Sequence, residues 1–355
     1  MKKLTYILGL CFFLCFAFPE VGRAQEILWN ADFDFRFDNR EYGEPSNMVA
    51  PSTTLFGANM SPELGLGWGY GHSLMVGATI PADRESENFM GEPEFVAYYA
   101  YEGKTFSTTL GLLPRKKLFG RYSYAFFSDT YRFYNPTIKG WLVQYDKPDW
   151  FVEFGGDWNG LYSPMGRDNF TLFVAGESHK SITYAGYTAL LHHLFSEANV
   201  TNSLSDIYVG LDFSELLRNA KLSVQVAWVN GYQSRRGEVS SVVTTKGFEA
   251  EINARYTDYG LRNTFYKGDN LMPLWDMPNG VGGNLGESLY FGDPFYRVGD
   301  KGYYNRLELF WEPKMSEGVS LRISSVHHYD GAHWGWQQTV ALSLSIGSDM
   351  FAPIR

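Results

Sequence analysis

Cysteine is nearly absent from the sequence. The 355 residues contain two, Cys11 and Cys15, and both lie in a stretch that resembles a secretory signal peptide. Two lysines precede the apolar run 4–18, and small residues at positions 22 and 24 fit a cleavage site, so we predict cleavage after Ala24. The exported chain would then be residues 25–355, with no cysteine. Such a chain holds neither a disulfide framework nor a thiolate metal site.

A basic excess and a long apolar run are missing too. Removing residues 1–24 takes away three basic residues but only one acid, so 30 basic and 39 acidic residues become 27 and 38, a net charge of −11. Nucleic acid is therefore not expected as a partner. No exported segment approaches 18 consecutive apolar residues, so no transmembrane helix is predicted. The sequence also lacks a Gly-rich phosphate loop, a dinucleotide fingerprint and a zinc-binding pattern, so we predict no cofactor and no metal.

Aromatic residues are abundant. They make up 17% of the chain, with 24 tyrosines and 10 tryptophans. Both side chains suit a membrane–water boundary, because part of each is apolar and part forms hydrogen bonds. An exported, cysteine-free chain of this composition fits best in the bacterial outer membrane, with lipid as its first partner.

The clearest strand pattern lies in residues 246–257, KGFEAEINARYT. Five apolar residues, beginning at Phe248, alternate with five polar or charged residues, beginning at Glu249. Successive side chains of a strand point to opposite faces, so one face is apolar and the other ionic. Residues 27–37 alternate in the same way. One such strand fits a soluble sandwich as well as a membrane barrel. The chain as a whole favours the barrel, with apolar side chains towards lipid and charges towards a wet lumen.

Sixteen strands are predicted, at roughly 20 residues per strand and connection, although 14 or 18 also fit. Connections after odd-numbered strands are mostly long, and those after even-numbered strands are mostly short. The longest connections are 38–54, 113–139 and 268–301. The polar stretches 192–203 and 231–245 are also predicted as loops, and Pro62 makes the second strand the weakest. Long outer loops and short periplasmic turns are typical of a transmembrane, antiparallel up-and-down β-barrel with both termini in the periplasm.

Continuing the alternation assigns charged side chains to the lumen. Five basic residues fall on five consecutive predicted strands, and neighbouring strands are about 4.8 Å apart, so we predict a basic ladder up one wall. The ladder consists of Lys221, Arg255, Arg262, Arg306 and Arg322. The predicted acidic residues of the lumen are Asp32, Asp34, Glu153 and Asp157. Opposed charges across a narrow lumen would select solutes. Alternatively, the ladder is structural, with its arginines simply paired to Glu249, Glu251 and Glu308.

The connection 113–139 combines basic and aromatic residues after the fifth predicted strand. Its basic residues are Arg115, Lys116, Lys117, Arg121 and Arg132. The architecture of the exported chain resembles a 16-stranded porin of Gram-negative outer membranes, and the Tyr- and Gly-rich style suggests a Bacteroidetes-type barrel. That resemblance implies passive diffusion of small hydrophilic solutes. It also implies that this connection folds into the lumen as a constriction, favouring anionic or sugar solutes, and it allows a homotrimer. A solvated outer loop is the alternative.

One feature departs from such barrels, which usually end on an aromatic residue. Here the last aromatic, Phe351, precedes the final residue by four positions.

Two other functions also fit the residues. The connection 268–301, rich in Gly, Pro and Trp, fits an outer loop that binds a partner or a surface polysaccharide, with the lumen largely closed. The second function is a hydrolytic site. Four residues lie close together in the sequence of the last outer loop, and a His and a carboxylate among them could serve as general base or metal ligands. These are His327, His328, Asp330 and His333. No serine with a nucleophile signature lies beside them, so we predict no enzymatic activity and no catalytic residue.

Overall fold

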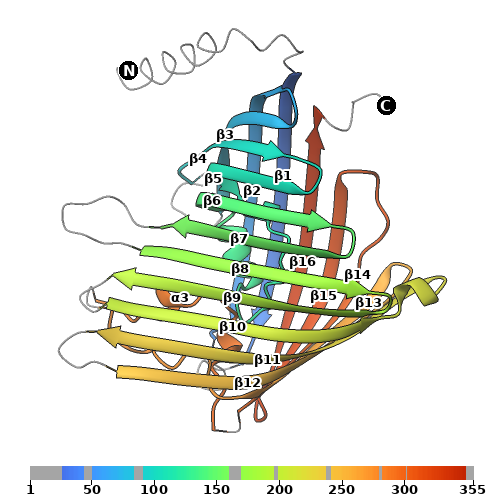
Figure 1. The fold of residues 1–355 in the computed structure, drawn as a ribbon. Helices are drawn as coiled ribbons and strands as arrows, with labels where there is room; N and C mark the ends of the chain where they lie inside the picture. The colour runs from blue at the N-terminus through green and yellow to red at the C-terminus, as the bar shows by residue number, and fades with distance from the viewer. Residues whose placement is uncertain are drawn as a thin grey trace.

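The computed structural model describes residues 26–43, 50–83, 91–159, 169–195, 199–236, 241–279, 282–300 and 302–348. The predicted signal peptide and Phe351 lie outside these ranges. Within them, sixteen strands form one closed antiparallel barrel, in which each strand pairs with its sequence neighbours and β1 closes the ring against β16. Figure 1 shows this closure, with blue β1 beside red β16. The predicted fold class and the count of 16 strands are confirmed. No helix in the described ranges is long and apolar enough to cross a membrane.

The strands are β1 (Glu26–Glu41), β2 (Thr53–Trp68), β3 (His72–Asp83), β4 (Glu94–Glu102), β5 (Phe106–Pro114), β6 (Thr137–Lys147), β7 (Trp150–Trp158), β8 (Asn169–Lys180), β9 (Thr183–Phe195), β10 (Asn199–Asp212), β11 (Ala220–Arg236), β12 (Ser241–Tyr256), β13 (Tyr259–Gly268), β14 (Tyr303–Trp311), β15 (Val319–Tyr329) and β16 (Trp334–Gly347). We call the end of the barrel with the long connections the outer end and the end with the tight turns the inner end.

Side-chain alternation decides which surface faces lipid. On β12, Phe248 and Ile252 are 39% and 46% exposed, whereas the intervening Glu249 and Glu251 are buried inside the barrel. Leu64, Ile207 and Leu309 are likewise exposed on other strands. Exposure of this many large apolar side chains is unfavourable in water, whereas it is favourable in contact with the hydrocarbon of a membrane. The apolar exterior and charged interior predicted from residues 246–257 are therefore confirmed.

Aromatic side chains gather near both rims of the barrel exterior. Trp150, Tyr256 and Tyr259 are exposed at inner strand ends, and Trp158 and Trp334 at outer ends. Two aromatic girdles of this kind mark the two membrane–water boundaries of outer-membrane barrels.

Pro62 does not interrupt the second strand, although its presence made this strand the weakest of those predicted from the sequence. β2 runs unbroken through it, with Ala31 of β1 opposite Pro62. On the other side the β2–β3 pairing stops at Met60↔Ile80 and resumes in the same register at Glu63↔Gly77. Because proline has no N–H to donate, the β2–β3 pairing is interrupted locally at Pro62, and the strand continues in the same register on both sides of the gap.

The two polar stretches predicted as loops at 192–203 and 231–245 are mostly strand, and those predictions are wrong. β9 and β10 leave residues 196–198 between them, and β11 and β12 leave residues 237–240. The polar inward side chains of these strand ends bond to chain folded inside the barrel: His192 Nε2 lies 3.1 Å from the Ser288 carbonyl oxygen, and Gln233 donates to the Leu271 carbonyl at 3.3 Å. Polar composition here reflects interior partners, not a solvated turn.

Two connections at the outer end fold into the barrel. The first inserted segment, residues 115–136, contains the 3₁₀ turn Arg115–Lys117 and α2 (Asp129–Tyr134). The second inserted segment, residues 269–302, contains α3 (Gly286–Leu289) and the 3₁₀ turn Pro294–Tyr296. The remaining short helical element is the 3₁₀ turn Ser214–Leu216 between β10 and β11. The buried apolar members of the two segments include Tyr122, Tyr124, Ala125, Phe126, Phe127, Leu271, Met272, Leu274, Leu285, Leu289, Tyr290, Phe291, Phe295, Tyr296 and Val298.

Candidate functional site

A carboxylate on the barrel wall holds the start of the first inserted segment. Glu153 on β7 accepts hydrogen bonds from the backbone N–H groups of Phe119 and Gly120, both at 2.8 Å, and from the Tyr122 hydroxyl at 2.9 Å. Its side chain is buried, so these donors replace water around the charge. Glu153, predicted as a lumen acid, therefore anchors this segment.

Asp157, two residues further along β7, holds the Arg115 side chain. Arg115 donates to Asp157 Oδ2 at 2.7 Å, and its other N–H groups reach the carbonyls of Asn135 and Thr137 at 2.7 and 3.1 Å. Both charged side chains are buried. Arg115 thereby ties the two ends of the first inserted segment to one wall.

The same segment reaches the opposite wall. Arg121 lies 3.2 Å from Glu251 on β12, and the Tyr124 ring lies between Arg262 and Arg306, whose guanidinium carbons are 4.6 and 4.2 Å from the ring centre. Burial raises the pKa of the Tyr124 phenol even against these two cations, so the ring stays neutral between them. The first inserted segment thus spans the lumen.

The second inserted segment packs on the first. The N–H of Ser128 donates to the Phe291 carbonyl at 2.8 Å, and the N–H of Asp293 to the Tyr124 carbonyl at 2.7 Å. The rings of Tyr131 and Phe291 stack at 4.4 Å. A Cβ at Gly292 would collide with the backbone of Ala125, so the close approach requires glycine there.

Together the two segments cover the inward face of β9–β12. Many inward side chains along the middle of these strands are 5% exposed or less, including Thr188, Gln225, Val229, Glu249 and Glu251. Asn202 on β10 donates to the Leu289 carbonyl, and Thr188 on β9 to the Arg121 carbonyl. This part of the lumen is filled by protein.

The remaining space contains three cavities in series along β1, and the outer one also reaches His192 and Leu194 at the outer end of β9. We call them the outer, middle and inner cavities, with volumes of about 1010, 400 and 830 Å³. β1 lines all three in order along its length: Arg40 faces the outer cavity, Asp32 and Asp34 the middle cavity, and Glu26 and Leu28 the inner cavity. The cavities therefore follow β1 from one end of the barrel to the other.

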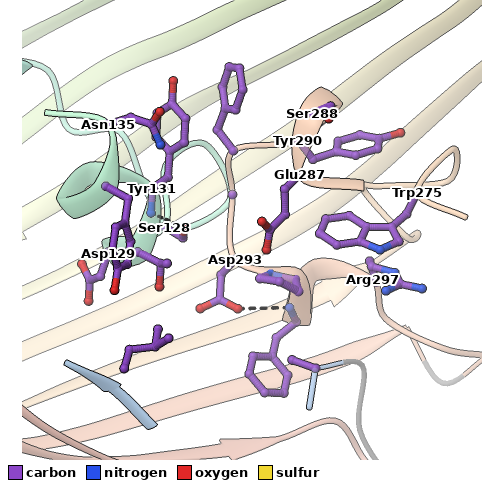
Figure 2. Close-up of a pocket in the computed structure, with 18 of the residues that line it drawn as sticks. Ser128, Asp129, Tyr131, Asn135, Trp275, Glu287, Ser288, Tyr290, Asp293 and Arg297 are labelled. Carbon is purple, nitrogen blue, oxygen red and sulfur yellow. Dashed lines mark hydrogen bonds between the residues drawn. The ribbon is translucent and has the colours of Figure 1, made fainter. Parts of the chain in front are cut away.

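Figure 2 shows the outer cavity, with the two inserted segments facing each other. The first, in green, contributes Ser128, Asp129, Tyr131 and Asn135. The second, in orange, contributes Trp275, Glu287, Ser288, Tyr290, Asp293 and Arg297. Burial raises the pKa of Tyr131 to about 12, although the adjacent Arg115 lowers it, so this phenol remains a donor at physiological pH.

Adjacent cavities share lining residues, and these residues mark two necks. Arg36 and Asp129 line both the outer and middle cavities, and they form an ion pair of 3.6 Å. We call this the outer neck. Glu63, Pro114 and Lys116 line both the middle and inner cavities. We call this the inner neck; Lys116 forms an ion pair there with Asp32.

The basic ladder residues lie on the inward face, and four of them are paired with glutamates. Arg262 bonds Glu251, Arg306 bonds Glu308, Arg322 bonds Glu308 and Glu312, and Arg255 bonds Glu312. Lys221 is exposed at the inner end of β11.

Register shows that the ladder is not one continuous rise. Arg255 of β12 pairs with Gly260 of β13, and Arg262 is two residues further along β13 towards the outer end. Arg306 of β14 pairs with Thr264, which is two residues further again along β13. Arg322 then lies six residues back from His328, the partner of Arg306. Of these five residues, Arg306 lines the outer cavity, and the other four line none of the three cavities.

The remaining predicted residues divide between anchors and cavity lining. Asp32, Asp34, Lys116 and Arg132 line the middle cavity, and Lys117 lines the inner cavity. Arg115 pairs with Asp157 and also lines the middle cavity, and Arg121 pairs with Glu251 and Glu249. Sequence reasoning missed Arg36, Arg40 and Glu63 as lining residues, although the alternation in residues 27–37 already placed Arg36 on the polar face.

An outer loop that binds a partner was one alternative for the connection 268–301, and its described residues include many that are buried inside the barrel. Its sequence held a signal, because LMPLW and SLYF are far more apolar than a solvated loop requires.

The histidines of the last outer loop are not brought together. His327 and His328 point to opposite faces of β15: His327 lies beside the Trp334 ring, and His328 is buried against Tyr304 and Gln337. His333 pairs with Asp330 in the loop itself. Among the described residues, no group of three or more His, Cys, Asp or Glu side chains is arranged to hold a metal ion.

Comparison with solved structures concerns the fold. A loop L8 deletion mutant of OmpT, an outer membrane protein of Vibrio cholerae, aligns with a TM-score of 0.54 at 9% identity, over 91% of this chain and 100% of that one. The fold is that of an outer-membrane porin barrel. Pseudomonas aeruginosa OccK2 (OpdF) aligns with a TM-score of 0.51 at 10% identity, over 90% and 98% of the two chains. A triple mutant of the Rh. blastica porin gives 0.50 at 10% identity, over 90% and 100%. No protein-family model and no curated protein matches the sequence.

Proposed function

We propose that this barrel is a passive channel for small hydrophilic solutes, which cross it along the β1 side through the outer, middle and inner cavities. The observation that carries the proposal is the series of shared lining residues, which connects cavities from one rim to the other. The two inserted segments fill much of the lumen beside β9–β12 and so reduce a wide barrel to a narrower path. Narrowing of this kind converts a general pore into a filter.

Charged side chains along the path would supply the filtering. The outer cavity presents Arg36, Arg40 and Arg306 together with Asp129 and Asp293. Opposed charges across a narrow, low-dielectric passage create a transverse field that favours polar solutes and excludes apolar ones of similar size. Neutral sugars and small ions both suit such a passage.

The first inserted segment acts as the constriction in this proposal, and its basic residues take different roles. Lys116 and Arg132 line the middle cavity; Arg115 lines it too, and with Arg121 it holds the segment in place. For the basic ladder, the role in selection stays a prediction, and Arg306 is the member best placed to exert it.

Single-channel recording tests the proposal. Protein refolded in detergent and inserted into a planar bilayer should give stepwise, ohmic currents in KCl. A correctly folded barrel, verified by its heat-dependent mobility in gel electrophoresis, that gives no current would contradict it. That outcome would favour the alternative of outer loops that bind a partner or surface polysaccharide above a closed lumen.

Assembly and origin are separate predictions. The resemblance that suggests a homotrimer and a Bacteroidetes-type barrel concerns architecture alone. Crosslinking in native membranes would test the trimer.

A further inference from the structure

The inner neck places two carboxylates beside one lysine. Asp32 on β1 is opposite Ser61 of β2, and Glu63 is opposite Asn30, so the two acids are diagonal neighbours on the inward face. Diagonal neighbours on adjacent strands are about 7–8 Å apart, close enough for one long side chain to reach either carboxylate. Lys116 enters the same space from the first inserted segment.

The two carboxylates are not equally satisfied. Asp32 pairs with Lys116 and accepts from Asn30 Nδ2 at 2.8 Å. Glu63 accepts from the Tyr98 hydroxyl at 2.9 Å through Oε2, whereas its Oε1 has no hydrogen-bond partner among the described residues. Glu63 is 6% exposed and lines both cavities. A buried carboxylate oxygen without a donor favours binding of a cation.

Lys116 is the most exposed member of the cluster. Its side chain is 53% exposed, against 8% for Asp32. A lysine is a flexible point charge with three donors, and partly exposed ion pairs contribute little net energy, so Lys116 can leave Asp32 at small cost. The wall acids, in contrast, stand on a rigid barrel.

We propose that the inner neck is a cation filter in which the Lys116 ammonium is a tethered counter-ion that a passing small monovalent cation replaces. The inference rests on the proposed channel function. Asp32, Glu63 and Lys116 leave one net negative charge at the point where the path passes from the middle to the inner cavity. A cation enters between Asp32 and Glu63 as the lysine swings aside, and an anion meets two fixed carboxylates.

Reversal potentials in a KCl gradient test the filter. Wild type should prefer K⁺ over Cl⁻. Lys116→Gln adds one net negative charge to the neck and should raise the K⁺/Cl⁻ permeability ratio by about three- to tenfold. Lys116→Arg keeps the charge and should keep the wild-type ratio. The double variant Asp32→Asn/Glu63→Gln should reverse the preference towards Cl⁻.

Lys147→Gln is the matched control, because Lys147 also lies at the inner end, at the β6–β7 turn, and lines none of the three cavities. Its permeability ratio should stay at the wild-type value.

A larger current in Lys116→Gln with an unchanged ratio would overturn the filter, since it would show simple widening. Conducting wild type with no response in any neck variant would overturn the filter and leave the channel standing. Silent wild type in a folded barrel would overturn both.

Discussion

Arg115 donates to Asp157 at 2.7 Å, and neither side chain has more than 7% of its surface exposed. Removing one partner of a buried ion pair leaves an uncompensated charge, which typically costs about 3–5 kcal/mol. Asp157→Asn should therefore lower the free energy of unfolding by roughly this amount, measured by urea titration in detergent micelles.

Glu102→Gln is the control for that change. The pair between Lys117 and Glu102 is partly exposed, so its loss should cost less than about 1 kcal/mol. Equal effects of the two substitutions would contradict the anchoring role of Asp157.

The second inserted segment should limit conductance. The N–H of Gly268 donates to the Gly302 carbonyl at 2.9 Å, so β13 and β14 are already joined at its base, and a short Gly/Ser turn can replace residues 271–298. The shortened protein should keep its strand content by circular dichroism and show at least about a twofold higher single-channel conductance, because a filled part of the lumen is emptied. Unchanged conductance would show that this segment does not border the path.

Arg306 and Arg262 offer a matched comparison within the basic ladder. Each glutamate keeps a second guanidinium when one is removed: Glu308 keeps Arg322, and Glu251 keeps Arg121. Arg306 lines the outer cavity and Arg262 does not, so Arg306→Gln should lower relative anion permeability by roughly twofold, whereas Arg262→Gln should leave it unchanged. The readout is the reversal potential, and a shift with Arg262→Gln alone would refute the assignment of the path to the β1 side.

Asp330 in the last outer loop should give a pH-dependent contribution to stability. Burial raises the pKa of its carboxyl, but N–H bonds from His333 and Ala332, at 2.7 and 2.8 Å, outweigh burial and hold the pKa below its ordinary value. A depressed pKa stabilises the folded state above the unfolded pKa, and the benefit disappears as pH falls through the folded value. Asp330→Ala should thus destabilise by less than about 1 kcal/mol near pH 7 and make no difference in strong acid. A difference that persists in acid would mean the residue acts through something other than its charge.

Strand number, closure and lipid-facing surface could be predicted from sequence because alternation is a local property. Phe248 and Glu249 are adjacent and must face opposite sides of any strand. The same rule placed Asp32 and Arg306 inside. Loop boundaries were harder to predict, because polar residues such as Gln233 are typical of solvated loops. In the structure the Gln233 side chain instead donates a hydrogen bond to the segment folded inside the barrel.

The path itself could not be read from the sequence. Arg262 and Arg306 both face inward by alternation and both contact Tyr124, yet only the folded structure shows that Arg306 borders the outer cavity and that Arg262 borders none of the three cavities. The register between β1 and β2 places Glu63 diagonally from Asp32. Glu63 also lines the same cavity as Lys116, which is 53 positions away in the sequence. Nothing local to Glu63 records either relationship.

Cysteine accessibility tests the lateral path most directly. Residues 26–348 contain no cysteine, so single cysteines can be introduced without a background. Ser61 lines the middle cavity, and Thr188 faces inward on β9 beneath the inserted segments. A charged methanethiosulfonate reagent should reduce single-channel current through Ser61→Cys and leave Thr188→Cys unaffected. Block at Thr188→Cys without block at Ser61→Cys would contradict the account, because solutes would then cross on the side that the two segments fill.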